Sequence, residues 1–288
     1  MAHRSEAHKT ERRRRSSEGR LERLHGRHVI EEALRAGRRS LHRLLVKPPP
    51  IGADLQRLVD LAREMGLPVV EADSARLAEM AQSGDGAHQG AVLEAGSLPE
   101  LNGISELCAS AAGAGAGNRR FVVLDGVEDP QNVGGIARVM DAAGVNGLVL
   151  TRRRAPPLSP ALARASAGAI EWLPVARVTN LVRALNELKS EGFWVVAADP
   201  EASEELYALP DRLLEGDLVV VLGAEGRGLR PAVRGAVDHP VRIPMRGNVD
   251  SLNVATAGAV LLYELVRRIS PSARGGPGRP GFPGSDSD

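Results

Sequence analysis

Cysteine and aromatic residues are nearly absent from this 288-residue sequence, and each scarcity excludes a class of protein. The one cysteine, Cys108, cannot form an intrachain disulfide and is too few for a multi-cysteine zinc site. Aromatic residues make up only 2% of the chain, so Leu, Val, Ile and Ala must fill its core. We therefore expect a protein of the reducing cytoplasm that binds no metal ion.

Long apolar runs and a one-sided charge balance are also missing. No stretch approaches the roughly 20 apolar residues that a membrane-spanning helix needs, and the start of the chain lacks the apolar core of a signal peptide. The net charge is only +1, although residues 1–20 hold seven Lys or Arg against three Glu. Such a basic arm suggests a polyanionic partner, and a solubilising tail would explain it equally well.

The hydrophobic pattern divides the chain into two folded parts between polar or glycine-rich segments. We expect disordered tails at residues 1–20 and 271–288, a small α/β domain over 21–95, a linker over 96–118 that holds a short helix, and a second domain over 119–270.

Strands and helices alternate in the second domain. The apolar runs at 121–126, 147–151 and 218–223 are continuous, which predicts strands that are covered on both faces. We therefore expect an α/β fold with a parallel sheet flanked by helices. Ligands of such sheets bind in the loops at the carboxyl ends of the strands.

The first of three unusual loops covers residues 124–138. It runs from a strand end through a polar turn with Asn132 to Gly134 and Gly135 at a helix start, and Arg138 follows one to two turns along that helix. Glycines at a helix start let a phosphate or another backbone approach the free amides. A turn, a cap and a surface arginine would explain the same residues without any ligand.

The second and third loops differ in strength of signal. Residues 220–229 join a buried strand to a turn with three glycines and Glu225, but the turn lacks the dinucleotide spacing and the lysine of a P-loop. In the third loop, Ser251 is a candidate N-cap of the closing helix. Asn253 is a poor helix former without a local structural task, so it suggests a functional role. The small residues at 255–259 indicate close packing of this helix against another backbone.

In order and spacing, these three segments resemble the signature motifs of the SpoU/TrmH branch of the SPOUT methyltransferases. The third, IPMRGNVDSLNVATA at 243–257, is the most specific, and Ala255 within it departs from the serine of many relatives. The sequences HGRHVIEEALRAG at 25–37 and HQGAV at 88–92 resemble the RNA-binding domain that precedes the catalytic domain in 23S rRNA guanosine 2′-O-methyltransferases.

The resemblance implies transfer of a methyl group from S-adenosylmethionine to a ribose 2′ oxygen of RNA. The implied substrate is a guanosine of 23S rRNA in the peptidyl-transferase region, and the implied structure is a trefoil-knot homodimer. Similarity to the family assigns catalysis to Arg138, Asn132, Glu225, Ser251 and Asn253, and adenosine binding to backbone groups around Leu222, Gly223, Ile243, Met245 and Leu252.

The chemistry of arginine limits the role of Arg138. Its guanidinium stays charged below a pH of about 12, which makes it a poor base. We therefore expect Arg138 to clamp a phosphate of the substrate and to stabilise the developing alkoxide, and the identity of the base stays open.

Several alternatives remain at this point. The alternative targets are a tRNA guanosine and a drug-resistance adenosine, and the alternative to an enzyme is a non-catalytic RNA-binding assembly protein. A binding module does not need all five of the residues assigned to catalysis, so their joint presence argues against it. They are Asn132, Arg138, Glu225, Ser251 and Asn253. A doubly wound dinucleotide enzyme is disfavoured because no glycine-rich phosphate loop follows the strand at 121–126, and the strand at 147–151 ends in arginines instead of an acidic residue.

Overall fold

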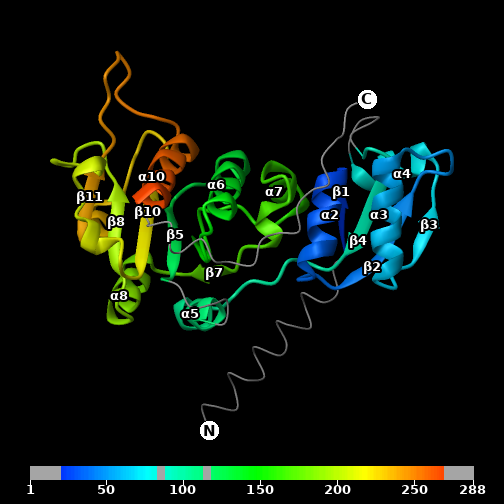
Figure 1. Ribbon diagram of the computed structural model, residues 1–288, viewed down its shortest axis with the longest axis horizontal. Helices are drawn as coiled ribbons and strands as arrows, with labels where there is room; N and C mark the ends of the chain where they lie inside the picture. Colours follow the sequence, from blue (N-terminus) through cyan, green and yellow to red (C-terminus); the bar gives the residue numbers. More distant parts are fainter. Residues whose placement is uncertain (1–20, 83–87, 113–117, 269–288) are drawn as a thin grey trace, which may run out of the picture.

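The structure of the chain is a computed structural model that describes residues 21–82, 88–112 and 118–268. The expected tails at 1–20 and 271–288 lie outside the described residues. Two sheets form separate layers at the two ends of the molecule (Figure 1). None of the helices in the described ranges combines the length and the apolar character needed to cross a bilayer.

The N-terminal part is a four-stranded sheet with helices on both faces. Its strand order is β1-β4-β2-β3, in which β4 is antiparallel to β1 and β2, and β3 is parallel to β2. Helices α2 and α3 cover one face, and α4 covers the other through Leu77 and Met80. The elements are β1 (Glu22–His25), α2 (Arg27–Ala36), β2 (Leu41–Val46), α3 (Ala53–Glu64), β3 (Val69–Glu71), α4 (Ser74–Ala81) and β4 (Ala91–Ala95).

The second part is a seven-stranded sheet in which every pairing is parallel, as predicted. Its strand order is β7-β6-β5-β10-β8-β11-β9, so β10 lies between two strands that precede it in the chain. The elements are α5 (Ile104–Ala112), β5 (Arg120–Asp125), α6 (Pro130–Ala142), β6 (Gly147–Thr151), α7 (Pro160–Ala165), η1 (Ala169–Glu171), β7 (Val175–Val178), α8 (Leu181–Ser190), β8 (Trp194–Ala198), β9 (Glu204–Glu205), η2 (Leu206–Ala208), η3 (Asp211–Leu213), β10 (Leu218–Gly223), α9 (Pro231–Arg234), β11 (His239–Arg242) and α10 (Val254–Arg268).

Alternate residues of the strands fill two cores. Val122 and Leu124 of β5 pack under α6 and α10, whereas Phe121 and Val123 pack under α5 and α8. A period of two is what an extended chain requires when both faces are covered. This double coverage explains why the strands are continuously apolar in the sequence.

The region expected to be a linker between the domains is largely part of the second domain. The short helix forms as α5, but its Leu107 is fully buried and packs against Gly147 of β6. Ahead of it, Leu101 donates its amide to the carbonyl of Val175 and accepts a bond from the amide of Arg177. Residues 101–112 therefore extend the sheet and its core, and only the Ala- and Gly-rich stretch at 113–117 lies outside the described residues.

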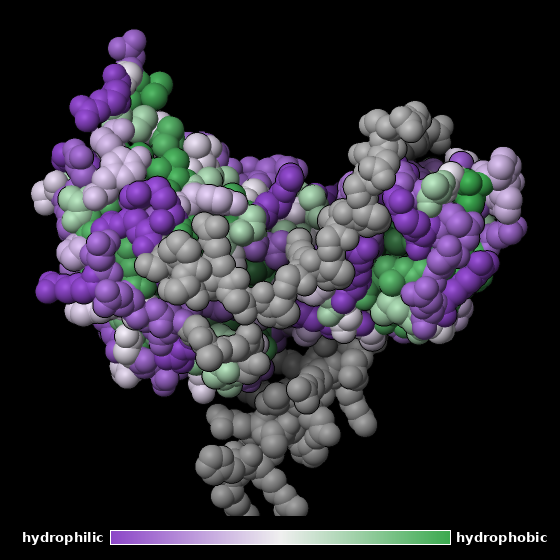
Figure 2. All heavy atoms as spheres, in the orientation of Figure 1, coloured by the Kyte–Doolittle hydropathy of each residue, from purple (hydrophilic) through white to green (hydrophobic). Residues whose placement is uncertain are grey.

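The two domains meet at a polar, buried contact. Arg39, between α2 and β2, binds Glu171 of η1 with Nε–Oε2 and Nη2–Oε1 distances of 2.7 and 2.9 Å. Nearby, Arg38 donates to the carbonyl of Leu173 at 2.6 Å, and Trp172 Nε1 donates to Glu32. Figure 2 shows the two lobes, whose outer surfaces in this view are more hydrophilic than hydrophobic.

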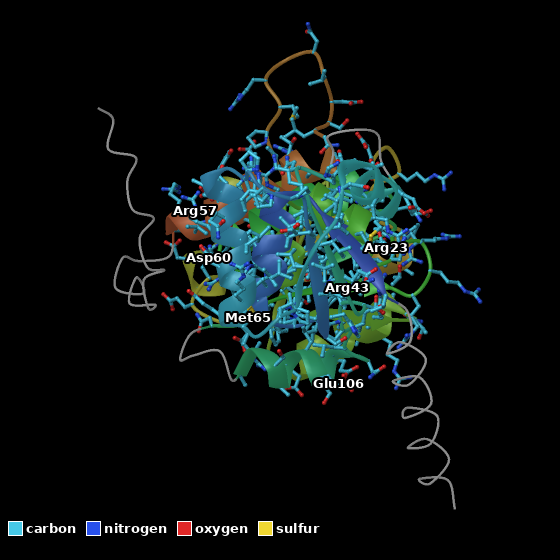
Figure 3. All side chains as sticks on the ribbon, turned by 90° about the vertical axis from the view of Figure 1, so that its right-hand side faces the viewer. Arg23, Arg43, Arg57, Asp60, Met65 and Glu106 are labelled. Atoms are coloured by element: carbon cyan, nitrogen blue, oxygen red, sulfur yellow. The ribbon has the colours of Figure 1, made fainter. Side chains whose placement is uncertain are left out.

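Most arginines of the N-terminal domain are neutralised by neighbouring acids. Arg23 of β1 and Arg43 of β2 lie on the two strands that flank β4, and both pair with Glu94 of β4. The distance from Arg43 Nε to Glu94 Oε2, 2.6 Å, is the shorter of the two. Arg57 and Asp60 lie on α3, on the other side of the domain (Figure 3). Arg57 pairs with Asp54 of the same helix. The exposed surface of this domain therefore carries little unpaired positive charge at these positions.

Candidate functional site

The first motif folds as a tight start of α6 on the end of β5. Asp129 caps the helix by accepting a bond from the amide of Gln131 at 2.9 Å, and Pro130 occupies the first turn. A Cβ on Gly134 would lie 2.6 Å from the carbonyl carbon of Ala165, and one on Gly135 would lie 3.1 Å from the Cβ of Ala255. The two glycines therefore let the end of α7 and the start of α10 approach α6 closely.

The second motif is a compact turn at the carboxyl end of β10. A Cβ on Gly223 would lie 2.4 Å from the carbonyl carbon of Gly228, which only a glycine avoids. The amide of Gly228 donates to the carbonyl of Ala224 at 2.8 Å and closes the turn. The turn fixes the backbone on both sides of Glu225, whose side chain is exposed.

The third motif corrects the expected N-cap of the closing helix. Ser251 does not cap it, because α10 begins at Val254 and the hydroxyl of Ser251 instead donates to Asp250. Asn253 is the cap, since its Oδ1 accepts bonds from the amides of Ala255 at 2.9 Å and Thr256 at 3.4 Å. Asn253 therefore does have a local structural task, contrary to the expectation from its helix propensity.

One hydrogen-bonded chain joins the three motifs. The side-chain nitrogen of Asn253 donates to Oδ1 of Asn132 at 2.8 Å, and that of Asn132 donates to Oε2 of Glu225 at 3.3 Å. Asn132 lies 93 positions before Glu225 and 121 positions before Asn253 along the chain. Only Asn132 is partly shielded, so the chain of amides and carboxylate borders solvent. The acceptor Glu225 holds Asn132 in one orientation, which leaves Oδ1 of Asn132 facing Asn253.

The other two expected catalytic residues stand apart from this chain. Arg138 lies on α6, one turn beyond Gly135, with its side chain exposed. Within the described residues it has no hydrogen-bond or ion-pair partner, so its guanidinium is available to an anion. Ser251 belongs to the exposed stretch 246–251, part of the loop that stands out beyond the sheet between β11 and α10 (Figure 1).

The five residues expected to bind adenosine lie at adjoining strand ends. Leu222 and Gly223 end β10, beyond the last residue of β10 that pairs with β8, Val221. Ile243 and Met245 follow β11, and Leu252 precedes α10. The last three are half-buried, and no described group accepts a hydrogen bond from their amides. Apolar side chains beside unpaired amides are the groups that a purine base needs, so these residues fit an adenosine.

Two further features were not expected from the sequence. Asp125, at the end of β5, is almost fully buried and accepts bonds from the amide and Nε of Arg230 at 2.9 and 2.6 Å. Buried Arg177 of β7 donates to the carbonyls of Thr151 at 3.2 Å and Pro156 at 2.7 Å. In the sequence, the run of three arginines directly after residue 151 was the only sign that this edge of the sheet is charged. In the described ranges, no cluster of three or more His, Cys, Asp or Glu side chains could hold a metal ion.

Comparisons with known proteins match both parts of the chain. The model of the SpoU rRNA Methylase family matches residues 119–263, and that of the RNA 2′-O ribose methyltransferase substrate-binding domain matches 23–101. The chain is 37% identical over 249 residues to the 23S rRNA (guanosine-2′-O-)-methyltransferase RlmB of a Burkholderia species, covering 86% of this chain and 97% of that one. It is 35% identical over 252 residues to RlmB of Pseudomonas aeruginosa, covering 87% and 98%.

A solved structure shares the fold. The SpoU methyltransferase AviRb from Streptomyces viridochromogenes, crystallised with AdoMet, matches with a TM-score of 0.70 at 23% identity. The match covers 89% of this chain and 92% of that one, so it includes both sheets.

Proposed function

Because the chain belongs to the SpoU rRNA Methylase family, we propose that it transfers a methyl group from S-adenosylmethionine to a ribose 2′ oxygen of RNA. The observation that carries this proposal is the hydrogen-bonded chain from Asn253 through Asn132 to Glu225, which joins all three motifs at one edge of the sheet. A structural cap alone would not need the second and third members of this chain.

The ends of β10 and β11 are where the methyl donor would be held. Amides and carbonyls around Leu222, Gly223, Ile243, Met245 and Leu252 would bind its adenosine. When bound, the donor would supply a methyl group on a sulfonium. The ribose oxygen would pass its proton to water or to a basic side chain as it forms the new bond to carbon, and the sulfur would keep the electron pair of the broken bond.

The remaining residues position the ribose. Asn132 and Asn253 present an amide pair whose orientation is set by Glu225 and by the helix start. Arg138 would clamp a substrate phosphate and stabilise the developing alkoxide, because preorganised donors aimed at developing charge lower the barrier. Ser251 would contribute a hydroxyl to the substrate, and in the free protein that hydroxyl donates to Asp250.

We also propose that the chain acts as a homodimer in the cytoplasm. Tyr263 and Val266 of α10 are 50% and 38% exposed, and Val249 in the loop before that helix is 63% exposed. Apolar side chains of this size favour contact with a second copy. Light scattering of the purified protein gives the mass that tests this proposal.

The substrate we favour is a guanosine of 23S rRNA, because the relatives that match most of the chain carry that activity in their names. Residues 21–95 would contact the RNA, and residues 119–270 would perform the transfer. Ribosomal RNA from a strain that lacks the gene is methylated with labelled donor, and the modified nucleotide is mapped. Label in a ribose 2′-O-methylguanosine of 23S rRNA supports the proposal, and its absence from all RNA refutes it.

A further inference from the structure

We propose that a cleft of arginines at the carboxyl ends of β5, β6 and β7 grips the backbone phosphates of the RNA substrate. The inference rests on the proposed function and deepens it, because it names where on the catalytic domain the RNA chain is held. We refer to this feature as the arginine cleft. It is lined by Gly126, Thr151, Arg152, Arg153, Arg154, Thr179 and Arg230.

The arginine cleft is an open hollow of about 520 Å³ that contains no acidic side chain in its lining. A second hollow, of about 220 Å³, shares Thr179 and Arg230 with it and continues toward the start of α8. The two together form a track along the edge of the sheet. This is the edge where parallel α/β sheets bind their ligands.

The positive charge of the arginine cleft is not neutralised. Arg152, Arg153 and Arg154 are all exposed, and within the described part of the chain none of their side chains has an ion-pair or hydrogen-bond partner. Several other arginines of the same domain are paired, as Arg119 is with Asp217 at 2.6 Å. Three adjacent unpaired guanidinium groups repel one another, and a polyanion relieves that repulsion.

Hydrogen bonds from a buried arginine hold the loop that carries these three arginines in one conformation. Buried Arg177 binds the carbonyls of Thr151 and Pro156, the residues on either side of the loop, and its Nε is paired with Glu100 at 2.8 Å. The hydroxyl of Thr151 donates to the carbonyl of Arg153. Arg154 has a φ of 59°, which non-glycine residues adopt only where their surroundings enforce it. A fixed loop loses less conformational entropy when it binds a ligand.

Arg230 adds hydrogen-bond donors on the opposite wall. Its Nε and amide are held by buried Asp125, and its side chain is still 48% exposed. Both terminal nitrogens lack a described partner, so they are free to donate. The ion pair orients Arg230, while the three successive arginines supply the net charge.

The arginine cleft adjoins the candidate active site. A Cβ on Gly126 would lie 3.8 Å from the Cβ of Ala224, the residue before Glu225. A backbone held in the cleft therefore passes beside the turn that carries Glu225. We infer that the cleft holds phosphates next to the reacting nucleotide, because a small anion would not need several unpaired arginines along a track.

The test compares charge removal in the arginine cleft with charge removal elsewhere. The triple variant Arg152→Gln, Arg153→Gln, Arg154→Asn keeps a residue at position 154 that tolerates positive φ. Arg212→Gln is the matched control, because Arg212 is also exposed and without a described partner. It lies on η3, beside Leu214, whose carbonyl binds Arg120 at the amino end of β5, so it is at the opposite edge of the sheet.

Affinity for an in vitro transcript of 23S rRNA is measured over a range of salt concentrations, and donor binding is measured by calorimetry. Each lost phosphate contact lowers the slope of log K against log salt by roughly 0.7 to 0.9. We expect the triple variant to lose about 2 from this slope and the control to lose nothing, with donor affinity unchanged in both. The single variant Arg153→Gln should lose about 0.7, and it keeps the test available if the triple variant folds poorly.

An unchanged slope in the triple and single variants overturns the inference. Loss of donor binding with unchanged RNA affinity also overturns it, because the cleft would then serve the carboxylate of the methyl donor. Failure of the proposed function gives a different result, since the unaltered protein would then methylate no RNA at all, whatever its salt dependence.

Discussion

The guanidinium of Arg39 and the carboxylate of Glu171 form a two-bond ion pair in which the side chains are 0% and 1% exposed. The same guanidinium also binds Glu22 and the carbonyl of Gly96. Burial lowers the pKa of Arg39, but the hydrogen bonds and attraction of Glu171 and Glu22 outweigh it and raise that pKa above its ordinary value. Arg39 therefore stays charged, and its bonds to Glu171 join the two domains.

Removing one partner of this pair should destabilise the chain strongly. Arg39→Ala leaves Glu171 buried without a counterion, which typically costs about 3 to 5 kcal/mol. The free energy of unfolding in urea measures the loss. The double variant Arg39→Met, Glu171→Leu should cost much less than the two single changes together, because no fully buried charge is then left unpaired and Glu22, which is 17% exposed, can still reach water. A double variant that loses as much free energy of unfolding as the two single variants added together would contradict this account.

Gly134→Ala should also destabilise the protein, although alanine is the better helix former by about 1 kcal/mol. Its Cβ would lie 2.6 Å from the backbone carbon of Ala165, and overpacking of this kind costs about 1 to 3 kcal/mol. Gly52→Ala is the control, because a Cβ there meets nothing within 4 Å and the glycine has a φ of −76°. Thermal unfolding of both variants checks the prediction, and a stabilised Gly134→Ala variant would show that α7 moves aside easily.

Variants of Asn253 should separate its two roles. Asn253→Ala loses the cap and the bond to Asn132, so stability should fall by about 1 kcal/mol and methylation should slow. Asn253→Ser keeps a capping oxygen but no amide to reach Asn132, so stability should recover while the rate stays about tenfold low. Single-turnover methylation beside thermal unfolding distinguishes the roles. Full activity in the serine variant would leave Asn253 as a cap alone.

Arg138→Ala should leave folding and donor binding near normal, because Arg138 has no described partner. The methyl transfer rate should fall by a factor of roughly 100 to 1,000, which is typical of losing one preorganised donor. Arg138→Lys should stay slow as well, since lysine keeps the charge but not the two-pronged geometry. Near-normal single-turnover rates in Arg138→Ala would remove Arg138 from the catalytic set.

Cys108 should react slowly with thiol reagents at neutral pH. Its side chain lies on the inner face of α5, and burial raises the pKa of its thiol, so little thiolate forms. Adding an aromatic disulfide reagent to native and to urea-unfolded protein measures the difference, and the native protein should react many times more slowly. Rapid reaction of the native thiol would indicate that α5 detaches readily from the sheet.

The sequence predicted the elements better than their contacts. Residues 218–223 form a strand, as predicted, because a continuous apolar stretch of six residues is stable only where both of its faces are buried. The placement of β10 between β5 and β8 follows from long-range pairing, which no local pattern encodes. In the same way, Leu107 was assigned to a linker because its burial depends on Gly147, forty residues further along the chain.

The candidate site shows a similar division. Resemblance to a family brought Asn132, Glu225 and Asn253 together, and the structure places these three in one hydrogen-bonded chain. The sequence did not identify Asn253 as the N-cap because the first residue of α10 depends on the conformation of the loop before it. Arg39 and Glu171 were missed because an arginine in a polar stretch is ordinarily a surface residue, and only the meeting of two domains buries it.

The position of β10 has a consequence for synthesis of the chain. Every residue of the sheet up to the end of β8 is synthesised before Leu218, yet β5 and β8 join one sheet only when β10 pairs with both of them. Until then the facing edges of β5 and β8 are unpaired in the nascent domain. The loop that becomes the second motif follows that strand directly, so the candidate site is completed only after β10 has paired with both of its neighbours.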